Sequence, residues 1–178
     1  MSTKSYLPHT WADSRLFVKQ SHINGQGVFC GQDIRAGEVL MIWGGIPVPK
    51  DNFDTTAYRF QTVVPISEEL FLALPVTDQE DSVDEYLNHS CDPNTWLIDD
   101  VTVTARRDIP AGQELTLECA TWDDGTLTEY APAGICTCGA KSCRGILSSD
   151  DWKRPELQKE FAGHFSPFLA ERIRRLTD

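Results

Sequence analysis

Short apolar or alternating segments fill the first two thirds of the chain. RLFVKQ, GVFC and VLMIW, within residues 15–43, are each bounded by Gly, Asn or Asp, and the turns between them contain INGQG and IRAGE. Such segments predict β-strands joined by tight turns. Further strands are predicted over residues 56–64, 69–74, 101–109 and 114–122. Strands at intervals of about eight to twelve residues indicate a mainly β domain.

The pattern changes near the carboxyl end, where helices are predicted. A short helix is expected over residues 155–161, with Ser149 or Asp150 as its cap. Ser166 followed by Pro167 is typical of an N-cap and a first helical position. Apolar residues then recur at i, i+4 and i+7: Leu169, Ile173 and Leu176. This spacing predicts an amphipathic helix.

Charge and composition narrow the possible partners and location. The chain has 178 residues, which suits one domain, and a formal net charge of −11. Phosphate binding needs a basic face, so we expect no direct nucleic-acid partner; a basic peptide is favoured unless the charge serves only solubility. The amino terminus lacks the apolar core of a signal peptide, and no run of 18 apolar residues occurs. We therefore expect an intracellular protein without membrane association, cytoplasmic, or nuclear if the source is eukaryotic.

Clustered cysteines predict a metal site. Cys136, Cys138 and Cys143 form C-x-C-x4-C, and in a reducing compartment such clusters hold metal more often than disulfides. Zinc takes four thiolates in a tetrahedron, so one ligand is missing. The remaining cysteines are Cys30, Cys91 and Cys119, of which Cys91 lies in the polar turn NHSCDPN. Free thiols or one local disulfide are the alternative interpretation.

Several motifs then identify a family. The string Asn88-His89-Ser90-Cys91-Asp92-Pro93-Asn94 resembles the NHSC-x-PN signature of SET-domain lysine methyltransferases. Residues 25–29 resemble the family's G-x-G-V-F turn, and Trp43-Gly44-Gly45 its aromatic-x-Gly. Residues 111–116 resemble its AG-E-E-L-T strand entry, and CTCGAKSCRG (136–145) its post-SET element. The carboxyl-terminal segment also resembles the tail of compact, stand-alone SET proteins.

The resemblance implies a specific architecture. We expect a mainly β SET fold, a β-clip with a pseudoknot in which the NHSC segment threads under a loop. The expected parts are a SET domain over residues 11–122, a post-SET zinc element over 123–147 and a C-terminal helical extension over 148–178. The resemblance also implies that one structural zinc ion is bound by Cys91, Cys136, Cys138 and Cys143.

The same resemblance implies a pocket for S-adenosylmethionine. The cofactor-binding residues carried over from the family's motifs are Gly25, Gly27, Phe29, Trp43, Asn88 and His89. Glycines without Cβ let the backbone approach the cofactor, and the Asn-His pair would contact adenosine through its backbone. Taken singly, these residues also suit hairpin glycines, core aromatics and a turn.

One catalytic position departs from the family pattern. A tyrosine is expected in the second aromatic place after E-L-T, but the run here is Leu117-Glu118-Cys119. A thiol is a weaker hydrogen-bond donor than a phenol and can become a nucleophile as thiolate. Cys119 is therefore a candidate catalytic residue, although a small core residue would also suit a strand. Tyr58, Tyr86 or Tyr130 could compensate for the missing phenol.

These observations favour an S-adenosylmethionine-dependent SET methyltransferase that acts on a lysine side chain of a basic protein or peptide. Because of Cys119, two alternatives stay open. One is a SET-fold enzyme that uses S-adenosylmethionine on an unknown small molecule. The other is a catalytically inactive SET module that binds a peptide or partner.

Overall fold

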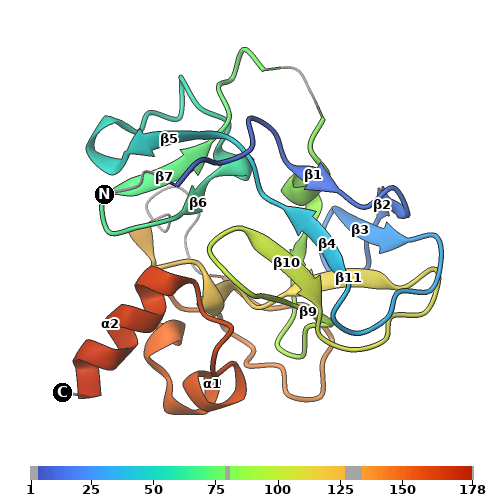
Figure 1. Ribbon diagram of the computed structural model, residues 1–178. Helices are drawn as coiled ribbons and strands as arrows, with labels where there is room; N and C mark the ends of the chain where they lie inside the picture. Colours follow the sequence, from blue (N-terminus) through green and yellow to red (C-terminus); the bar gives the residue numbers. More distant parts are fainter. Residues whose placement is uncertain (1–3, 79–80, 127–133, 178) are drawn as a thin grey trace.

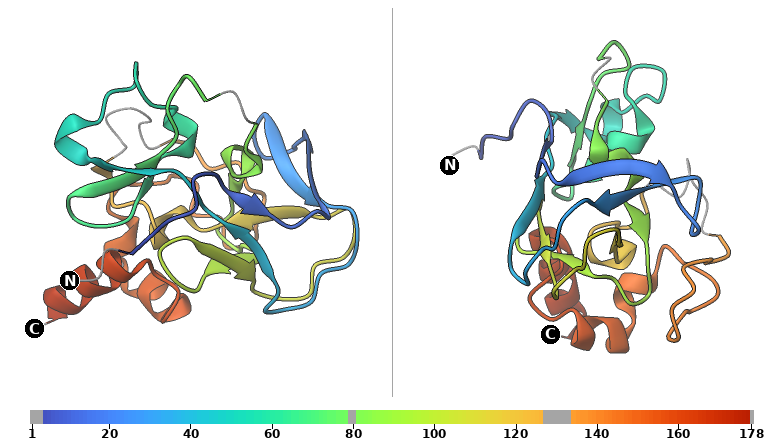
Figure 2. Two further views of the ribbon diagram at one scale, coloured as in Figure 1. Left: turned by 45° about the horizontal axis from the view of Figure 1, so that its top comes forward. Right: turned by 90° about the vertical axis from the view of Figure 1, so that its right-hand side faces the viewer.

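The computed structural model describes residues 4–78, 81–126 and 134–177 (Figure 1). Within these residues the strands form three small sheets, and two α-helices follow at the carboxyl end. Figure 2 shows the two helices together at one end of the molecule, below the sheets. The mainly β fold expected from the sequence is confirmed.

The first sheet has the order β1-β4-β10-β9 and is antiparallel throughout. Its strands are β1 (Trp11–Ala12), β4 (Val39–Ile42), β10 (Thr102–Ala105) and β9 (Thr95–Leu97). β10 is buried along its whole length, so its neighbours pack on both of its faces. The sheet therefore contributes much of the main core, which contains Leu40, Leu97 and Val103.

The second sheet brings the NHSC segment beside a later strand. Its order is β2-β3-β11-β8, with β2 (Leu16–Gln20), β3 (Gln26–Cys30), β11 (Glu114–Leu117) and β8 (Asn88–His89). β8 runs parallel to β11, with Asn88 opposite Thr116 and His89 opposite Leu117. The other pairings are antiparallel.

The third sheet has the order β5-β7-β6, with β5 (Ile46–Pro49), β7 (Leu70–Ala73) and β6 (Val64–Pro65). Proline cannot donate to a strand ladder and is confined mainly to edge strands. Pro47, Pro49 and Pro65 all lie on the two outer strands, in agreement with this rule. A separate apolar cluster around Val48 and Phe71 packs beneath this sheet.

Three predicted strands are shorter than the sequence pattern indicates, and the one over residues 101–109 is observed only as β10 (Thr102–Ala105). Over residues 56–64 the prediction is wrong except at its end, because the chain forms the 3-10 helix η2 (Phe60–Thr62) before β6. The Thr62 hydroxyl donates to the Arg59 carbonyl at 2.9 Å, a local bond that competes with a strand ladder. Similarly, β11 ends at Leu117 and is followed by η4 (Cys119–Thr121). Cys119 therefore lies on a turn.

The helical extension has its own apolar cluster. α1 (Pro155–Glu160) and α2 (Pro167–Thr177) agree with the predicted helices. The proposed caps are wrong for α1, whose N-cap residue is Arg154. Leu157 and Leu169 pack with Trp152 and other aromatic residues. Neither described helix has the length and apolarity needed to cross a membrane.

Three further 3-10 turns complete the described elements. They are η1 (Lys50–Asn52), η3 (Val83–Tyr86) and η6 (Asp151–Lys153). The second of these, η3, directly precedes β8 and packs against β2 and β3. It thus lies between the NHSC segment and the first hairpin.

Candidate active site and metal centre

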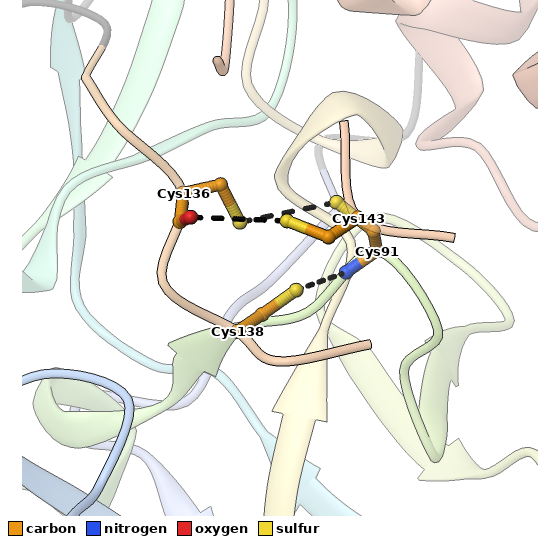
Figure 3. A group of neighbouring side chains, drawn as sticks. All are labelled: Cys91, Cys136, Cys138 and Cys143. Atoms are coloured by element: carbon orange, nitrogen blue, oxygen red, sulfur yellow. Dashed lines mark hydrogen bonds between the residues drawn. The ribbon is translucent and has the colours of Figure 1, made fainter. Parts of the chain in front are cut away.

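Four cysteine thiols converge beside β8 (Figure 3). Cys91 follows β8, and the other three ligand candidates come from the C-x-C-x4-C segment, Cys136, Cys138 and Cys143. The four sulfurs lie within 4.8 Å of one another, and Cys91 Sγ is 3.9 Å from Cys136 Sγ. A zinc tetrahedron with bonds of about 2.3 Å has sulfur–sulfur edges of about 3.8 Å. The donor set and its spacing therefore fit a zinc ion.

The cysteine spacing left three candidates for the fourth ligand, and the structure places Cys91 in the cluster. Cys30 is fully buried in the main core, and its thiol lies 3.1 Å from the Pro110 carbonyl. Cys119 lies on η4, outside the cluster. The backbone N–H of Arg144 donates to Cys91 Sγ at 3.4 Å, as is usual around a thiolate ligand.

A buried ion pair ties the cysteine segment to the end of β11. Arg144 donates two hydrogen bonds to the Glu118 carboxylate, at 2.6 and 2.7 Å, and a third to Asp151 at 3.1 Å. The Glu118 side chain has no exposed surface, and that of Arg144 is 8% exposed. A planar guanidinium bound in this two-pronged way holds its partner in one orientation. The ion pair thus joins the cysteine segment to the residue that follows β11.

A cavity of about 410 Å³ opens beside the cysteine cluster. Three stretches that are distant in sequence form its walls: Ile23 and Asn24; Asn88 and His89; and Ile135, Cys136, Thr137 and Leu147. Its volume lies in the usual range of small-molecule and cofactor sites. The mixture of apolar side chains with a few polar groups suits a ligand with both an aromatic ring and polar edges.

The Asn88 side chain connects two of the segments that form this cavity through hydrogen bonds. Its side-chain amide donates to the Gln26 carbonyl at 2.9 Å and to Glu114 Oε1 at 2.8 Å, and lies 3.2 Å from the Asn24 carbonyl. The β2–β3 turn is thereby held against β8. The side-chain amide of Asn88 is therefore engaged within the protein.

The two glycines of the β2–β3 turn, Gly25 and Gly27, are each constrained, one by its backbone conformation and the other by close neighbours. A Cβ on Gly27 would come within 2.1 Å of Glu114 Oε1 and 3.1 Å of Asn88 Nδ2. Gly25 has φ +46°, a conformation that favours glycine. Phe29 is buried with the Lys19 ammonium 4.0 Å from its ring centroid. None of these three, all expected in the cofactor pocket, is among the described residues that line the cavity.

A second, narrower cavity of about 40 Å³ adjoins the first through the contact between one lining residue of each, His89 and Cys119. Its lining consists of Trp43, Gln61, Val63, Val64, Asp84, Leu87, Leu117, Cys119 and Trp122. The Trp43 and Trp122 rings meet edge to face, with centroids 5.6 Å apart. The Cys119 N–H lies 3.4 Å from His89 Nδ1, so His89 and Cys119 stand between the two cavities. Trp43, expected in the cofactor pocket, lies on this narrower cavity.

The Cys119 thiol faces the narrow cavity as a neutral group. Burial raises its pKa well above that of an ordinary thiol, and the nearby carboxylates of Glu118 and Asp123 raise it further. A thiol in this state is a poor nucleophile. The environment therefore suits a small wall residue rather than a thiolate.

The tyrosines considered as substitutes lie elsewhere. Tyr58 stacks on Phe53 with ring centroids 5.9 Å apart, next to the Phe71 cluster. Tyr86 lies on η3 and packs against the main core. Neither is among the described residues that line the narrow cavity, and Tyr130 falls outside the described residues.

Sequence analysis missed several residues of both cavities. Asp84, Gln61 and Trp122 line the narrow one, and Asn24 and Leu147 the larger one. Asn24 stands within the INGQG turn and could have been found from its place beside Gly25. Asp84 lies in an acidic stretch typical of a solvated loop, so its sequence gave no signal.

Comparison with known proteins agrees with this geometry. The SET domain family matches residues 25–120, which is more than half of the chain. The chain therefore belongs to the SET-domain family.

Curated relatives include several histone-lysine methyltransferases. The chain is 31% identical over 147 residues to human histone-lysine N-methyltransferase 2B, covering 74% of this chain and 5% of that protein. It is 26% identical over 160 residues to the H3 lysine-9 specific dim-5 enzyme of Neurospora crassa, covering 69% of this chain and 48% of that protein. With the variant-silencing SET domain-containing protein of Plasmodium falciparum it shares 27% identity over 119 residues, covering 57% and 5%. The chain thus spans less than half of the length of these relatives.

Solved structures show the same fold. A crystal structure of KRYPTONITE in complex with mCHG DNA and SAH matches with a TM-score of 0.56 and 22% identity, over 74% of this chain and 28% of that one. A second KRYPTONITE structure, with mCHH DNA, an H3(1-15) peptide and SAH, matches with a TM-score of 0.55. Because those complexes contain DNA, the comparisons give no support to the expectation that nucleic acid is excluded.

Proposed function

We propose that this protein is an S-adenosylmethionine-dependent methyltransferase that acts on the side-chain amine of a lysine in a basic protein. The observation that carries the proposal is the pair of abutting cavities, one of cofactor size and one narrow and walled by two indoles. The family relatives named as histone-lysine methyltransferases support the reaction type. SAH in the KRYPTONITE complexes supports the cofactor.

The larger cavity has residues that would hold the cofactor. Asn24, Asn88 and His89 offer polar groups at one side, while Ile135 and Leu147 offer apolar cover at the other. S-adenosylmethionine, when bound, supplies an electrophilic methyl group on a sulfonium. The cysteine cluster, with zinc in place, would fix the segment that carries Ile135 and Leu147.

The narrow cavity would orient the amine. Trp43 and Trp122 give it apolar walls, and Leu117 and Val64 narrow it further. Such walls exclude water and align a nitrogen lone pair with the methyl group, and positioning of this kind supplies much of the rate in a displacement reaction. The nitrogen–carbon bond forms as the carbon–sulfur bond breaks, and the electron pair stays on sulfur.

The proposal keeps the three expected parts of the chain. A SET domain over residues 11–122 would hold both cavities, and a post-SET element over 123–147 would cover the larger one. The apolar cluster around Phe161 and Leu169 lies mainly within the extension over 148–178 and also includes Ala120 of η4, so the extension packs against the preceding domain. Residues 127–133 and 178 lie outside the described residues. If the substrate is a histone, the protein acts in the nucleus.

The first test is isothermal titration of S-adenosylmethionine into the zinc-loaded protein, with Asn88→Ala as the variant and Asn52→Ala, an exposed position on η1, as the matched control. We expect micromolar binding that is lost in Asn88→Ala and retained in Asn52→Ala. Mass spectrometry of core histones incubated with the cofactor should then show methylated lysine. Absence of cofactor binding would refute the proposal.

A second candidate function is supported by Cys119. No tyrosine is among the described residues that line the narrow cavity, so the phenol of the family pattern is absent from that wall. A SET-fold enzyme for a small molecule, or an inactive binding module, would tolerate this change. Cofactor binding without methylated lysine in any basic protein would favour the small-molecule enzyme. Peptide binding without cofactor binding would favour the module.

A further inference from the structure

Asp84 is an acidic residue on the wall of an otherwise apolar cavity. It belongs to η3 and lines the narrow cavity together with Trp43, Trp122 and Cys119. Apart from Gln61 and the Cys119 thiol, the other side chains of that lining are aliphatic or aromatic. In such a wall an alanine or a leucine would pack better than a carboxyl group, so packing does not account for Asp84.

The contacts of Asp84 fix its orientation without neutralising its charge. Its carboxyl group accepts a hydrogen bond from the Ser82 hydroxyl. In the part of the chain that the structure describes, no ion pair includes Asp84. Arg59, the cation whose charge reaches it, forms its ion pair with the adjacent Glu85.

Among the described residues, the ionised Asp84 carboxylate lacks an ion-pair partner to compensate for its lost hydration. Asp84 is half-buried, and removing part of a charged group from water costs free energy unless an opposite charge or several hydrogen bonds compensate. Burial raises the pKa of Asp84 above the ordinary carboxyl value, although the Ser82 and Thr10 hydroxyls oppose this. A cation in the cavity would offset the cost, and the two indoles beside it would add cation–π attraction.

We propose that Asp84 is a specificity-determining residue that receives the substrate side chain in its charged form, a primary alkylammonium, as it enters the narrow cavity; the amine then loses its proton before its lone pair attacks the methyl group. This inference rests on the proposed function, because it assigns a residue of this chain to recognition of the amine. The carboxylate would select a cationic chain over a neutral one of the same length. It would also partly replace the hydrogen-bonding group that Cys119 lacks.

The test uses the zinc-loaded full chain and n-butylammonium chloride, with 1-butanol as the neutral probe of similar shape. Binding is followed through the NMR signals of the Trp43 and Trp122 indole N–H groups, assigned by Trp→Phe variants. The variant is Asp84→Asn, which keeps the shape and removes the charge. The matched control is Glu85→Gln, which removes one negative charge from the same turn but outside the cavity lining.

We expect saturable shifts with n-butylammonium in the wild type and in Glu85→Gln, and binding at least tenfold weaker in Asp84→Asn. We also expect 1-butanol to bind the wild type at least tenfold more weakly than the cation, a comparison that holds even if Asp84→Asn folds poorly. Equal binding of the cation by wild type and Asp84→Asn, equal binding of the alcohol, or no binding of the cation would overturn the inference. Absence of S-adenosylmethionine binding together with Asp84-dependent cation binding would refute the proposed function and leave Asp84 only as a cation-binding residue, so the two failures are distinguishable.

Discussion

The Glu118 carboxylate and the Arg144 guanidinium form a two-pronged ion pair, sealed from solvent, at the junction between β11 and the cysteine segment. Glu118 directly precedes Cys119, and Arg144 directly follows Cys143. This salt bridge therefore connects the neighbour of Cys119, which lines the narrow cavity, to the neighbour of Cys143, which belongs to the cysteine cluster. Displacement of either side chain would disturb both regions.

Arg144→Ala is expected to lower the free energy of unfolding by about 3–5 kcal/mol, because it leaves the Glu118 carboxylate buried without its partner. Urea unfolding measures this loss. The control is Arg35→Ala, which breaks an ion pair with Asp108 whose two side chains are 77% and 60% exposed. That change should cost about 1 kcal/mol or less. Similar losses in the two variants would contradict the buried role of Arg144.

Metal content gives a second prediction. We expect one zinc ion per chain by atomic absorption, and removal with a chelator should lower the melting temperature by roughly 5–10 °C, since metal binding is coupled to folding. Cys138→Ser should lose the metal, whereas Cys30→Ala, a core change outside the cluster, should keep it. Full zinc occupancy in Cys138→Ser would show that the cluster is not the metal site.

Gly27→Ala tests whether the close packing of Gly27 against Glu114 and Asn88 supports the larger cavity. The new methyl group would meet the Glu114 carboxylate, which must move and give up its bonds to Asn88 and Ser21. Loss of about one hydrogen bond corresponds to roughly tenfold weaker cofactor binding. Gly31→Ala is the control, because its Cβ would lie 3.4 Å from the nearest atom. Calorimetric titration should separate the two variants, and equal affinities would show that Gly27 has no part in shaping the cavity.

The pH dependence of stability should reveal a second buried ion pair. Asp124 has no exposed side-chain surface and accepts a hydrogen bond from Lys50 at 2.7 Å. Burial raises the pKa of Asp124, but the hydrogen bonds from Lys50 and Thr126 outweigh this and hold its pKa below the ordinary value. Its contribution is then complete above the unfolded carboxyl pKa of about 3.9 and is lost as the pH falls through the lower folded value.

Asp124→Asn should therefore be less stable than the wild type at pH 7, and the difference should shrink once the pH falls below about 4. Urea unfolding at a series of pH values provides the measurement. Asp51→Asn, an exposed neighbour of Lys50, should change stability little at pH 7. A difference for Asp124→Asn that is constant from pH 7 to pH 2 would contradict the assigned pKa direction.

The sequence was informative where local rules decide the outcome. The β2–β3 hairpin follows from alternation around INGQG, and α1 and α2 follow from their prolines and apolar spacing. The cysteine cluster followed from ligand spacing together with the family motif, which supplied Cys91. In these cases nearby residues contain the needed information.

The remaining features depend on contacts between distant residues. Residues 56–64 alternate as a strand would, but the Thr62 hydroxyl bonds locally and the chain turns. The position of Asp84 in the cavity wall depends on how η3 packs on β2 and β3. The hydrophobic periodicity of the sequence does not predict this packing. The parallel pairing of β8 with β11 likewise joins segments that only the family resemblance connected.

The larger cavity is assembled from residues 23–24, 88–89 and 135–147, which together span most of the chain. During synthesis, the first two stretches leave the ribosome well before the third. A nascent chain that ends before residue 134 lacks an entire wall of that cavity and three of its four clustered cysteines. The larger cavity therefore takes shape only late in synthesis, once the cysteine segment has emerged and can close over the two earlier stretches.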